Sequence, residues 1–322
     1  MNNIFDEIIN SNTILLLTHE NPDGDAVGSL LAIYHMLKSM NKKVDAVMPE
    51  IPETFMYLNS IDKIHKTSSK HYDLAIVLDC ASKTRVANTN NELDRCKRTL
   101  VIDHHTGNSL YGDVNHVEGE ISSCCQVIYY LFKEWNIKIT KDIGEALITG
   151  LLTDTVGFKN NNVDENSFLM AADLTKLGID IHKIYYLALS KKTMAQYLLF
   201  KMALDKLELY DDGKIAFSYV SYEDMQNVGA KLGDHEGLVE IGRNIGGVEV
   251  SIFLRECGDF YRISLRSNGI VDVNKIAKKY GGGGHKMAAG IKLKDNFKEV
   301  KDALIEDIKK ELEANERNTS NQ

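Results

Sequence analysis

LLLTHENPDGDAVGSLLAI, residues 15–33, runs from an apolar strand through a turn into a helix with apolar residues at helical spacing. Three side chains that can bind a metal lie between the strand and the helix: His19, Asp23 and Asp25. Turn chemistry is the simplest explanation, because Pro22-Asp23-Gly24 is a common turn sequence and Asp25 can cap a helix N-terminus. The stretch predicts a strand, a turn and a helix, and leaves open whether the turn also holds a metal.

Strands and helices alternate through the first half of the chain. Apolar runs predict strands at 13–18, 43–49, 73–80 and 99–105, and helical spacing predicts helices at 122–135, 142–153, 165–177 and 181–189. Near-continuous apolar strands separated by helices indicate a parallel sheet with helices on both faces. The first half is therefore expected to be an α/β domain.

The pattern changes near residue 190. One long helix is predicted over 191–210, followed by strands at 214–221, 247–256, 259–267 and near 288–294, and by helices at 272–280 and 296–313. This mixture indicates a smaller α+β domain. We therefore expect an α/β domain at 1–190, a helical linker at 191–212 and an α+β domain at 213–322.

Composition and charge restrict the function. The chain of 322 residues has a formal net charge of −8, so the basic face expected of a protein that binds long duplex DNA is not indicated. Its five cysteines show no CxxC spacing, which argues against a disulfide framework or a structural zinc site. The sequence has neither an apolar run long enough to span a membrane nor a signal-peptide pattern. We expect a cytoplasmic protein that acts on a small or short anionic substrate.

Side chains that bind hard metal ions follow predicted strands or helices at four places. In chain order they are His19 with Asp23 and Asp25, then Asp79, then Asp103-His104-His105, and then Asp154. Taken singly, each has an ordinary explanation as a turn residue, a surface imidazole or a helix-end residue. Sites of open parallel sheets form in the crevice outside the carboxyl ends of the strands, so the four places together predict a site.

The ligand types favour a particular chemistry. Imidazoles and carboxylates without thiolates suit Mn²⁺ or a related divalent ion, and the neighbouring Cys80 is expected on the other face of its strand. One ion would leave several carboxylates unneutralised, whereas two ions that share a carboxylate would not. Paired ions roughly 3.5–4 Å apart activate a water for attack on phosphorus and clamp the phosphoryl oxygens.

Five motifs, in order along the chain, closely resemble the DHH phosphoesterase family. They are THENPDGDAVGS at 18–29, Asp79 after a strand, DHH at 103–105, LLTDT at 151–155 and GGGGHKMAAG at 281–290. More narrowly, the chain resembles the stand-alone DHH–DHHA1 enzymes of the NrnA type, which are oligoribonucleases and phosphatases of 3′-phosphoadenosine-5′-phosphate (pAp). The resemblance implies a catalytic DHH domain followed by a substrate-binding DHHA1 domain.

The resemblance also implies a site with two Mn²⁺, for which Mg²⁺ or Co²⁺ can substitute. By position, the first ion takes His19, Asp23 and Asp79, and the second takes Asp25, Asp79, His104 and Asp154, so that Asp79 is the bridge. His105 matches a histidine near the transferred phosphate that assists proton transfer, and Asp103 is expected to orient a neighbouring histidine. Asn21 and Thr155 match positions that hydrogen-bond around the metals. Many relatives read TDTG where this chain reads TDTVGF at 153–158, which leaves the place of Phe158 open.

The glycine run of the second domain has two physical explanations. Consecutive glycines expose backbone amides to a phosphate, but they also suit a flexible helix end. The following His285 and Lys286 favour anion binding. The resemblance implies a substrate site made by Arg266, whose guanidinium suits a bidentate phosphate contact, by its neighbour Ser267, and by Gly282, Gly283, Gly284 and His285. Arg262, earlier on the same strand face, is either a site residue or a solvated arginine.

We therefore expect a Mn²⁺-dependent hydrolase that cleaves short RNA or DNA oligonucleotides, such as pApA, to mononucleotides, or pAp to AMP. A Mn²⁺ inorganic pyrophosphatase shares the metal motifs, but the glycine motif and Arg266 argue against it. A RecJ-like single-strand exonuclease is disfavoured by the negative net charge and by the lack of an additional nucleic-acid-binding domain. A non-catalytic nucleotide sensor would be expected to have lost at least one ligand. The apolar helices of the first domain leave room for a homodimer.

Overall fold

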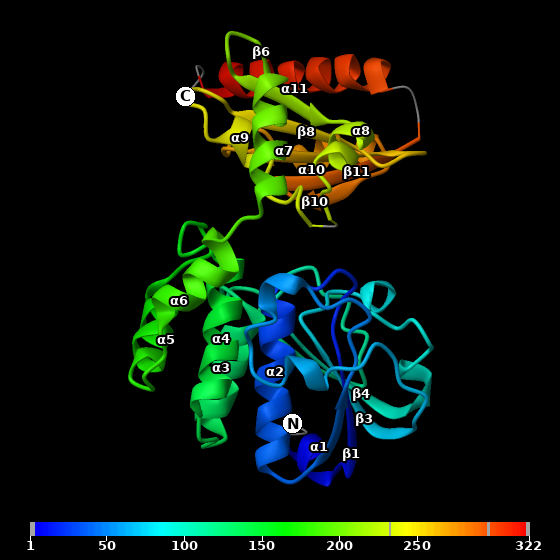
Figure 1. Ribbon diagram of the computed structural model, residues 1–322, viewed down its shortest axis with the longest axis vertical. Helices are drawn as coiled ribbons and strands as arrows, with labels where there is room; N and C mark the ends of the chain where they lie inside the picture. The colour runs from blue at the N-terminus through cyan, green and yellow to red at the C-terminus, as the bar shows by residue number, and fades with distance from the viewer. Residues whose placement is uncertain (1–3, 232, 295–296, 320–322) are drawn as a thin grey trace. The chain divides into compact units, whose positions relative to one another are not determined.

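The computed structural model describes residues 4–231, 233–294 and 297–319. The chain divides into two compact units, Met1–Lys191 and Lys192–Gln322, and each unit has its own sheet and its own core (Figure 1). Within the described residues, no helix combines the length and the apolar character that crossing a membrane requires.

The sheet of the first unit is entirely parallel. Its strands are β1 (Thr13–Leu17), β2 (Lys43–Ala46), β3 (Tyr72–Leu78), β4 (Cys96–Asp103) and β5 (Val114–Val117), in the order β2-β1-β3-β4-β5. The chain order reverses between β1 and β3, and such a switch point is where open α/β sheets place their ligands. The parallel α/β architecture is as predicted. Strand β5 was not predicted, because its half-buried residues lack a continuous apolar run.

The helices of the first unit are α1 (Ile4–Asn10), α2 (Gly24–Ser39), α3 (Cys124–Glu134), α4 (Lys141–Asp154), α5 (Glu165–Thr175) and α6 (Ile181–Tyr185), which continues as the π-helix η5 (Tyr186–Ser190). Helices α2 and α3 lie against one face of the sheet, and α4, α5 and α6 pack on this helical layer (Figure 1). Helices α2, α3 and α4 pack on one another and close the main core (Figure 1).

The second face of the sheet is covered differently from the expectation. In the described part of the chain, connecting segments and short 3₁₀ helices cover it, including η3 (Lys83–Arg85) and η4 (Leu93–Arg95), rather than α-helices. Val86 and Leu93 from these segments pack on Leu15, Val77 and Val101 of the sheet. Apolar residues on both faces of a strand predict burial, and they do not specify which kind of segment covers them.

The second unit has a six-stranded mixed sheet in the order β10-β11-β9-β8-β7-β6. Among the strand pairs that the structure describes in this unit, β7–β8 is parallel and the others are antiparallel. The strands are β6 (Glu208–Tyr210), β7 (Ile215–Val220), β8 (Val250–Glu256), β9 (Tyr261–Ser267), β10 (Gly283–His285) and β11 (Ala288–Leu293). Helices α10 (Val273–Lys279) and α11 (Phe297–Thr319) pack on one face. Helices α7 (Met194–Asp205), α8 (Tyr222–Asn227) and α9 (Glu240–Arg243) accompany the other face.

The predicted linker helix over 191–210 is wrong at both ends. Helix α7 begins after Thr193, whose hydroxyl and the side chain of Gln196 form a capping box, and it ends at Asp205. Residues 208–210 form strand β6 instead. Leu199 and Ala203 of α7 are fully buried in the second unit, so the segment expected to be a linker is part of that unit.

Candidate metal centre

The turn after β1 holds Asp23, which caps the next helix and also faces His19. Oδ1 of Asp23 accepts hydrogen bonds from the backbone amides of Asp25 and Ala26, both at 3.0 Å, so Asp23 is the N-cap of α2. Its other oxygen, Oδ2, lies 3.9 Å from Nε2 of His19. The expectation that Asp25 caps the helix is wrong, because α2 already begins at Gly24. The turn thus caps a helix with one carboxylate oxygen and leaves the other facing a histidine.

Asp25 lies inside the first turn of α2, and its carboxylate is held by another helix. Its Oδ2 and Oδ1 accept the backbone amides of Cys124 and Cys125 at 2.6 and 2.9 Å, in the first turn of α3. A helix N-terminus favours a negative charge, so α3 helps to keep this fully buried carboxylate in place. Sequence reasoning missed this contact, because α3 begins about a hundred residues later.

Asp79 occupies the position between two histidines. It follows β3 with a φ of +53°, a left-handed conformation that costs free energy for a residue other than glycine and is frequent at functional sites. Its Oδ2 lies 3.7 Å from Nε2 of His19, and its Oδ1 lies 3.6 Å from Nε2 of His104. Oδ1 is buried and has no hydrogen-bond partner among the described residues. A buried carboxylate oxygen without a donor is costly unless a cation accompanies it.

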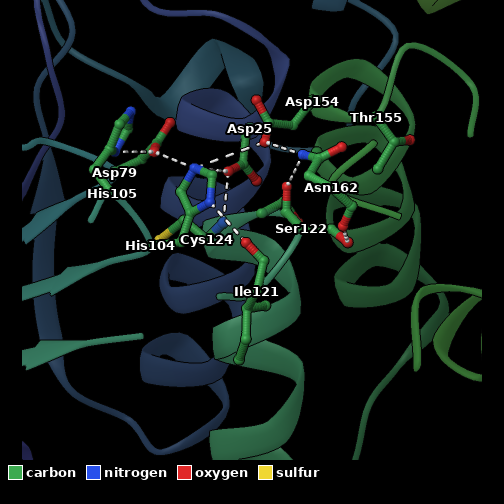
Figure 2. A network of polar contacts seen from close by, with 12 residues as sticks. Asp25, Asp79, His104, His105, Ile121, Ser122, Cys124, Asp154, Thr155 and Asn162 are labelled. Atoms are coloured by element: carbon green, nitrogen blue, oxygen red, sulfur yellow. Dashed lines mark hydrogen bonds and ion pairs between the residues drawn. The ribbon is translucent and has the colours of Figure 1, made fainter. Parts of the chain in front are cut away.

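Both histidines are oriented by backbone carbonyls. Nδ1 of His19 lies 2.8 Å from the carbonyl oxygen of Glu20, and Nδ1 of His104 lies 3.0 Å from that of Ile121. Because a carbonyl can only accept, each neutral imidazole keeps its proton on Nδ1 and presents the lone pair of Nε2. For His104, Nε2 faces Asp25 at 3.9 Å and Asp154 at 3.7 Å (Figure 2).

The structure brings the predicted ligands together in three overlapping groups, two of which include Asp79. Within each group, one ligand atom per residue lies within 4.8 Å of the others; the groups are His19, Asp23 and Asp79, then Asp79, His104 and His105, and then Asp25, His104 and Asp154. All donors are imidazole nitrogens or carboxylate oxygens, and the bridging position carries the orphaned oxygen. This donor set fits divalent ions such as Mn²⁺.

The pKa values of these groups reflect a crowd of buried acids. Burial and the charge of Asp79 raise the pKa of Asp25 to about 7, and burial and the charge of Asp25 raise the pKa of Asp154 to about 8. Burial alone would lower the pKa of His104, but the surrounding carboxylates outweigh it and raise that pKa to about 9. The same balance, with Asp79 as the main partner, raises the pKa of His19 to about 9. Without metal the centre retains protons that a cation would displace.

His105 is held by a series of hydrogen bonds. Its Nδ1 lies 2.8 Å from Oδ1 of the fully buried Asp103, and Oδ2 of Asp103 accepts from the side-chain amide of Asn108 at 2.6 Å. The histidine that Asp103 orients is therefore His105, which is a quarter exposed and also lies 3.7 Å from Oδ1 of Asp79. Asn108 lies in a loop without periodic pattern, so nothing in the sequence singled it out.

Asp154, at the end of α4, is surrounded by asparagines that the sequence did not point to. The side-chain amide of Asn162 donates to the carbonyl of Ser122 at 2.9 Å and reaches Oδ2 of Asp154 at 3.5 Å (Figure 2). Thr155 does not take the expected part around the metals. Its hydroxyl donates to the carbonyl of Leu151 and accepts the amide of Phe158, so it shapes the turn.

The loop that departs from the family pattern also has a defined place. Val156, Gly157 and Phe158 are three consecutive residues with left-handed φ. The ring of Phe158 stacks on Phe168 at 5.0 Å, so this aromatic packs against α5.

The glycine motif of the second unit is a strand and a helix end rather than an open loop. Gly283–His285 form β10, paired with β11. A Cβ on Gly282 would lie 2.2 Å from the carbonyl oxygen of Gly290, and one on Gly284 would lie 2.4 Å from that of Ala288. The amides of Gly282 and Gly284 already donate to Ala277 and Asn274. Two of the expected amide donors are thus used within the unit, whereas Gly283 and His285 are exposed, and a Cβ on Gly283 would meet only Asn274 Oδ1, at 3.9 Å.

The predicted residues of β9 differ in accessibility. Arg266 is partly exposed, with Nε 3.3 Å from Oε1 of Glu240, and Arg262 is exposed on the same strand face. Ser267 is fully buried, and its hydroxyl accepts the amide of Gly269 at 3.0 Å. Strand alternation turns Ser267 into the core, on the face of β9 opposite Arg266, so we do not carry it into the proposed site.

The fold and the centre together define a class of protein: an open parallel α/β unit with an acidic, histidine-containing centre for divalent ions at its switch point, followed by a mixed-sheet unit. Residues 13–151 match the model of the DHH family, N-terminal domain, and residues 212–314 match that of the DHHA1 domain. The chain belongs to the DHH/DHHA1 phosphoesterase family.

Similar proteins cover nearly the whole chain. It is 28% identical over 306 residues to the bifunctional oligoribonuclease and PAP phosphatase NrnA of Thermus thermophilus, covering 93% of this chain and 90% of the relative. To the protein of the same name from Bacillus subtilis it is 28% identical over 284 residues, covering 86% and 88%. A crystal structure of an exopolyphosphatase-related protein from Bacteroides fragilis matches with a TM-score of 0.88 and 26% identity, covering 97% of this chain and 94% of that one.

Proposed function

We propose that this chain is a Mn²⁺-dependent hydrolase of short oligonucleotides and dinucleotides, such as pApA, and that it also converts pAp to AMP. The observation that carries the proposal is the position of Asp79, whose two oxygens each face one histidine of a separate ligand group. Relatives named as oligoribonuclease and PAP phosphatase over about nine-tenths of the chain support the substrate class.

The proposed ligand sets are His19, Asp23 and Asp79 for one ion and Asp25, Asp79, His104 and Asp154 for the other. Two divalent ions held by these residues would supply an activated water and would neutralise the charge of phosphoryl oxygens. The chain contributes the fixed positions of its carboxylates. Asp23 and Asp25 are locked by helix amides, and the two imidazoles are locked by backbone carbonyls. Such preorganised ligands lose little freedom when ions bind.

His105 is proposed as the proton donor to the leaving oxygen. With Nδ1 held by Asp103, Nε2 is the nitrogen that can transfer a proton. Asp103 acts as a positioning residue, since its carboxylate fixes the ring and stabilises the protonated imidazole, while Asn108 fixes Asp103. The arrangement matches the general pattern of a base oriented by a third group.

In the second unit we propose Arg266, Gly283 and His285 as contacts to a substrate phosphate. Arg266 faces Glu240 through Nε and donates from Nη1 to the carbonyl of Leu265 at 3.1 Å, which leaves Nη2 for a phosphate. Gly282 and Gly284 are retained as structural glycines that permit the close approach of β10 and β11. Ser267 is not included, because it is buried.

A substrate panel tests the function. The full chain is treated with EDTA, reloaded with Mn²⁺ and assayed on pApA, a pentanucleotide, a long oligonucleotide, pAp, cyclic di-AMP and pyrophosphate. We expect turnover of pApA, the pentanucleotide and pAp, with little on the long oligonucleotide. Turnover of pyrophosphate alone, or a preference for the long oligonucleotide, would overturn the proposal in favour of a pyrophosphatase or a processive exonuclease.

The variant Asp79→Asn tests the metal centre without altering the rest of the chain. Asparagine keeps the shape and tolerates the left-handed backbone, but it removes the shared negative charge. We expect the variant to fold, to bind both Mn²⁺ ions more weakly than the parent, and to lose hydrolysis of every substrate. Asp62→Asn, on an exposed carboxylate paired with Lys63, is the matched control and should behave like the parent. Full activity of Asp79→Asn would exclude the two-metal assignment.

A further inference from the structure

Three cationic side chains lie directly opposite one another on neighbouring strands of the second sheet. Arg262 of β9 is the register partner of Arg255 on β8 and of Lys292 on β11. Directly opposed residues have Cβ atoms about 5 Å apart and project from the same face. The flanking Leu254, Ile263 and Ile291 belong to the core on the opposite face. We call Arg255, Arg262 and Lys292 the cationic row.

No carboxylate forms an ion pair with the row within residues 4–231, 233–294 and 297–319. Lys292 Nζ and the Arg262 guanidinium instead lie 4.4 and 6.0 Å from the centre of the Phe260 ring. Nε of Arg255 is buried and has no hydrogen-bond partner in the described part of the chain. Burial and the charge of Arg262 lower the pKa of the Arg255 guanidinium, and the charges of Cys257 and Glu236 act against this. Like charges placed opposite each other on adjacent strands destabilise a sheet, so the row carries a cost that a bound anion would relieve.

A histidine beside the row is also unpartnered. Nδ1 of His235 is buried without a hydrogen-bond partner among the residues that the structure describes. Burial, together with the charges of Arg255 and Arg262, lowers the pKa of His235 to about 4, so the imidazole is neutral near pH 7. A neutral imidazole adds a hydrogen-bonding group next to the cations without adding to their repulsion.

Several other cations of this unit form ion pairs. Arg266 pairs with Glu240, Lys301 with Glu208, and Lys206 with Asp224. In a chain with a net charge of −8, three adjacent cations without a described ion pair are therefore a local exception. Arg262 and Lys292 are exposed and Arg255 is half-buried, so the row is open to a ligand.

We propose that the cationic row binds backbone phosphates of an oligonucleotide beyond the phosphate held at Arg266. The proposal rests on the proposed function for its substrate class. Arg262 lies four residues before Arg266 on the same strand face, a rise of about 13 Å. A ligand that engages both ends of this face must carry more than one phosphate. The row thus favours oligonucleotides over a dinucleotide or pAp.

A double variant, Arg262→Gln with Lys292→Gln, tests the row without touching the core. Binding of a fluorescent RNA pentanucleotide to the full chain is measured in EDTA, where no turnover occurs, over a series of salt concentrations. We expect affinity to fall about tenfold for each phosphate that the variant no longer binds. The slope of log affinity against log salt should decrease by about 0.7 for each such phosphate. Lys201→Gln with Lys310→Gln, on exposed helix positions, removes the same charge and is the control.

Kinetics separate this proposal from the proposed function. In the Mn²⁺-loaded enzyme, the row variant should raise KM for the pentanucleotide about tenfold or more and leave KM for pApA unchanged. Equal effects on both substrates, or a salt slope and affinity equal to the control, would overturn the row. If the parent chain hydrolysed no nucleotide, but the row variant still lost oligonucleotide binding relative to the parent, the result would support the row and refute the proposed function.

Discussion

Gly150 is the residue whose substitution tests most directly how α3 and α4 position Asp25. It lies in α4, where a helical backbone accepts alanine readily. A Cβ at this position would lie 2.5 Å from Oδ1 of Asp25 and 2.2 Å from Sγ of Cys125. The carboxylate cannot yield freely, because the amides of Cys124 and Cys125 hold both of its oxygens. Gly150→Ala therefore forces the carboxylate of Asp25, a proposed metal ligand, away from the backbone amides that hold it.

The magnitude follows from two opposing effects. Replacing a helical glycine by alanine gains about 1 kcal/mol, whereas overpacking a core costs about 1–3 kcal/mol, so the free energy of unfolding should fall by roughly 0–2 kcal/mol. Relief of the steric overlap requires a shift of about 1 Å, beyond the tolerance of a metal ligand. We expect the ion at the Asp25, His104 and Asp154 group to bind about 10–100-fold more weakly. The ion at the His19 and Asp23 group should bind as before.

The assay is a titration of EDTA-treated protein with Mn²⁺, with free ion followed by electron paramagnetic resonance and stability measured by urea unfolding. Gly144→Ala in the same helix is the matched control. Its Cβ would meet the flexible end of Ile179, at 2.5 Å from Cδ1, far from any ligand. The control should bind two ions as the parent does. If Gly150→Ala also bound two ions with parental affinity, the positioning of Asp25 by α3 would be refuted.

Three further predictions concern protons and phosphate. In the metal-free chain, the free energy of unfolding should fall as pH rises from about 4 to 9. In the unfolded chain the carboxyl and imidazole groups have pKa values of 3.8 and 6.5 and release their protons in this range, whereas the folded state retains them. The groups with raised pKa values are Asp25, Asp154, His19 and His104. Urea unfolding in EDTA across this range checks the sign, and a rising stability would contradict it. Asp103→Asn should lower kcat about 10–100-fold and shift the pH profile while Mn²⁺ binding persists; loss of Mn²⁺ binding would place Asp103 among the ligands. Arg266→Ala should raise KM for pApA with little change in kcat, whereas Arg243→Ala, which removes the neighbouring partner of Glu240, should not; an unchanged KM would remove Arg266 from the substrate site.

The parallel sheet could be predicted because its signal is local. Strands such as β1 and β3 are apolar at nearly every position, and only burial on both faces explains that pattern. The end of α7 and the start of β6 could not be predicted in the same way. Residues 206–210 fit a helix as well as a strand, and pairing of Glu208–Tyr210 with β7 decides between them. This pairing is tertiary and leaves no trace in local spacing.

The residues that form the candidate centre could be predicted from topology, but the residues that hold them in place could not. The rule that sites form at the carboxyl ends of parallel strands brought together residues more than a hundred positions apart. The same rule says nothing about Asn108 or Asn162, which contact Asp103 and Asp154 from irregular loops. It also misleads for the glycine motif, since Gly282 and Gly284 are required by the close approach of two strands.

Each unit gathers charge of one sign in one place, and its own described side chains neutralise that charge only in part. The first unit gathers buried carboxylates, with an orphaned oxygen on Asp79 and a strained backbone at the same residue. The second unit gathers the cationic row, with an unpartnered nitrogen on Arg255. Cations relieve the first cost and phosphates relieve the second, so metal ions and a phosphoester should each stabilise the chain by binding. We therefore expect Mn²⁺ and an oligonucleotide to raise the midpoint of thermal unfolding separately. If the oligonucleotide raised the midpoint of the row variant as much as that of the parent chain, this account would be contradicted.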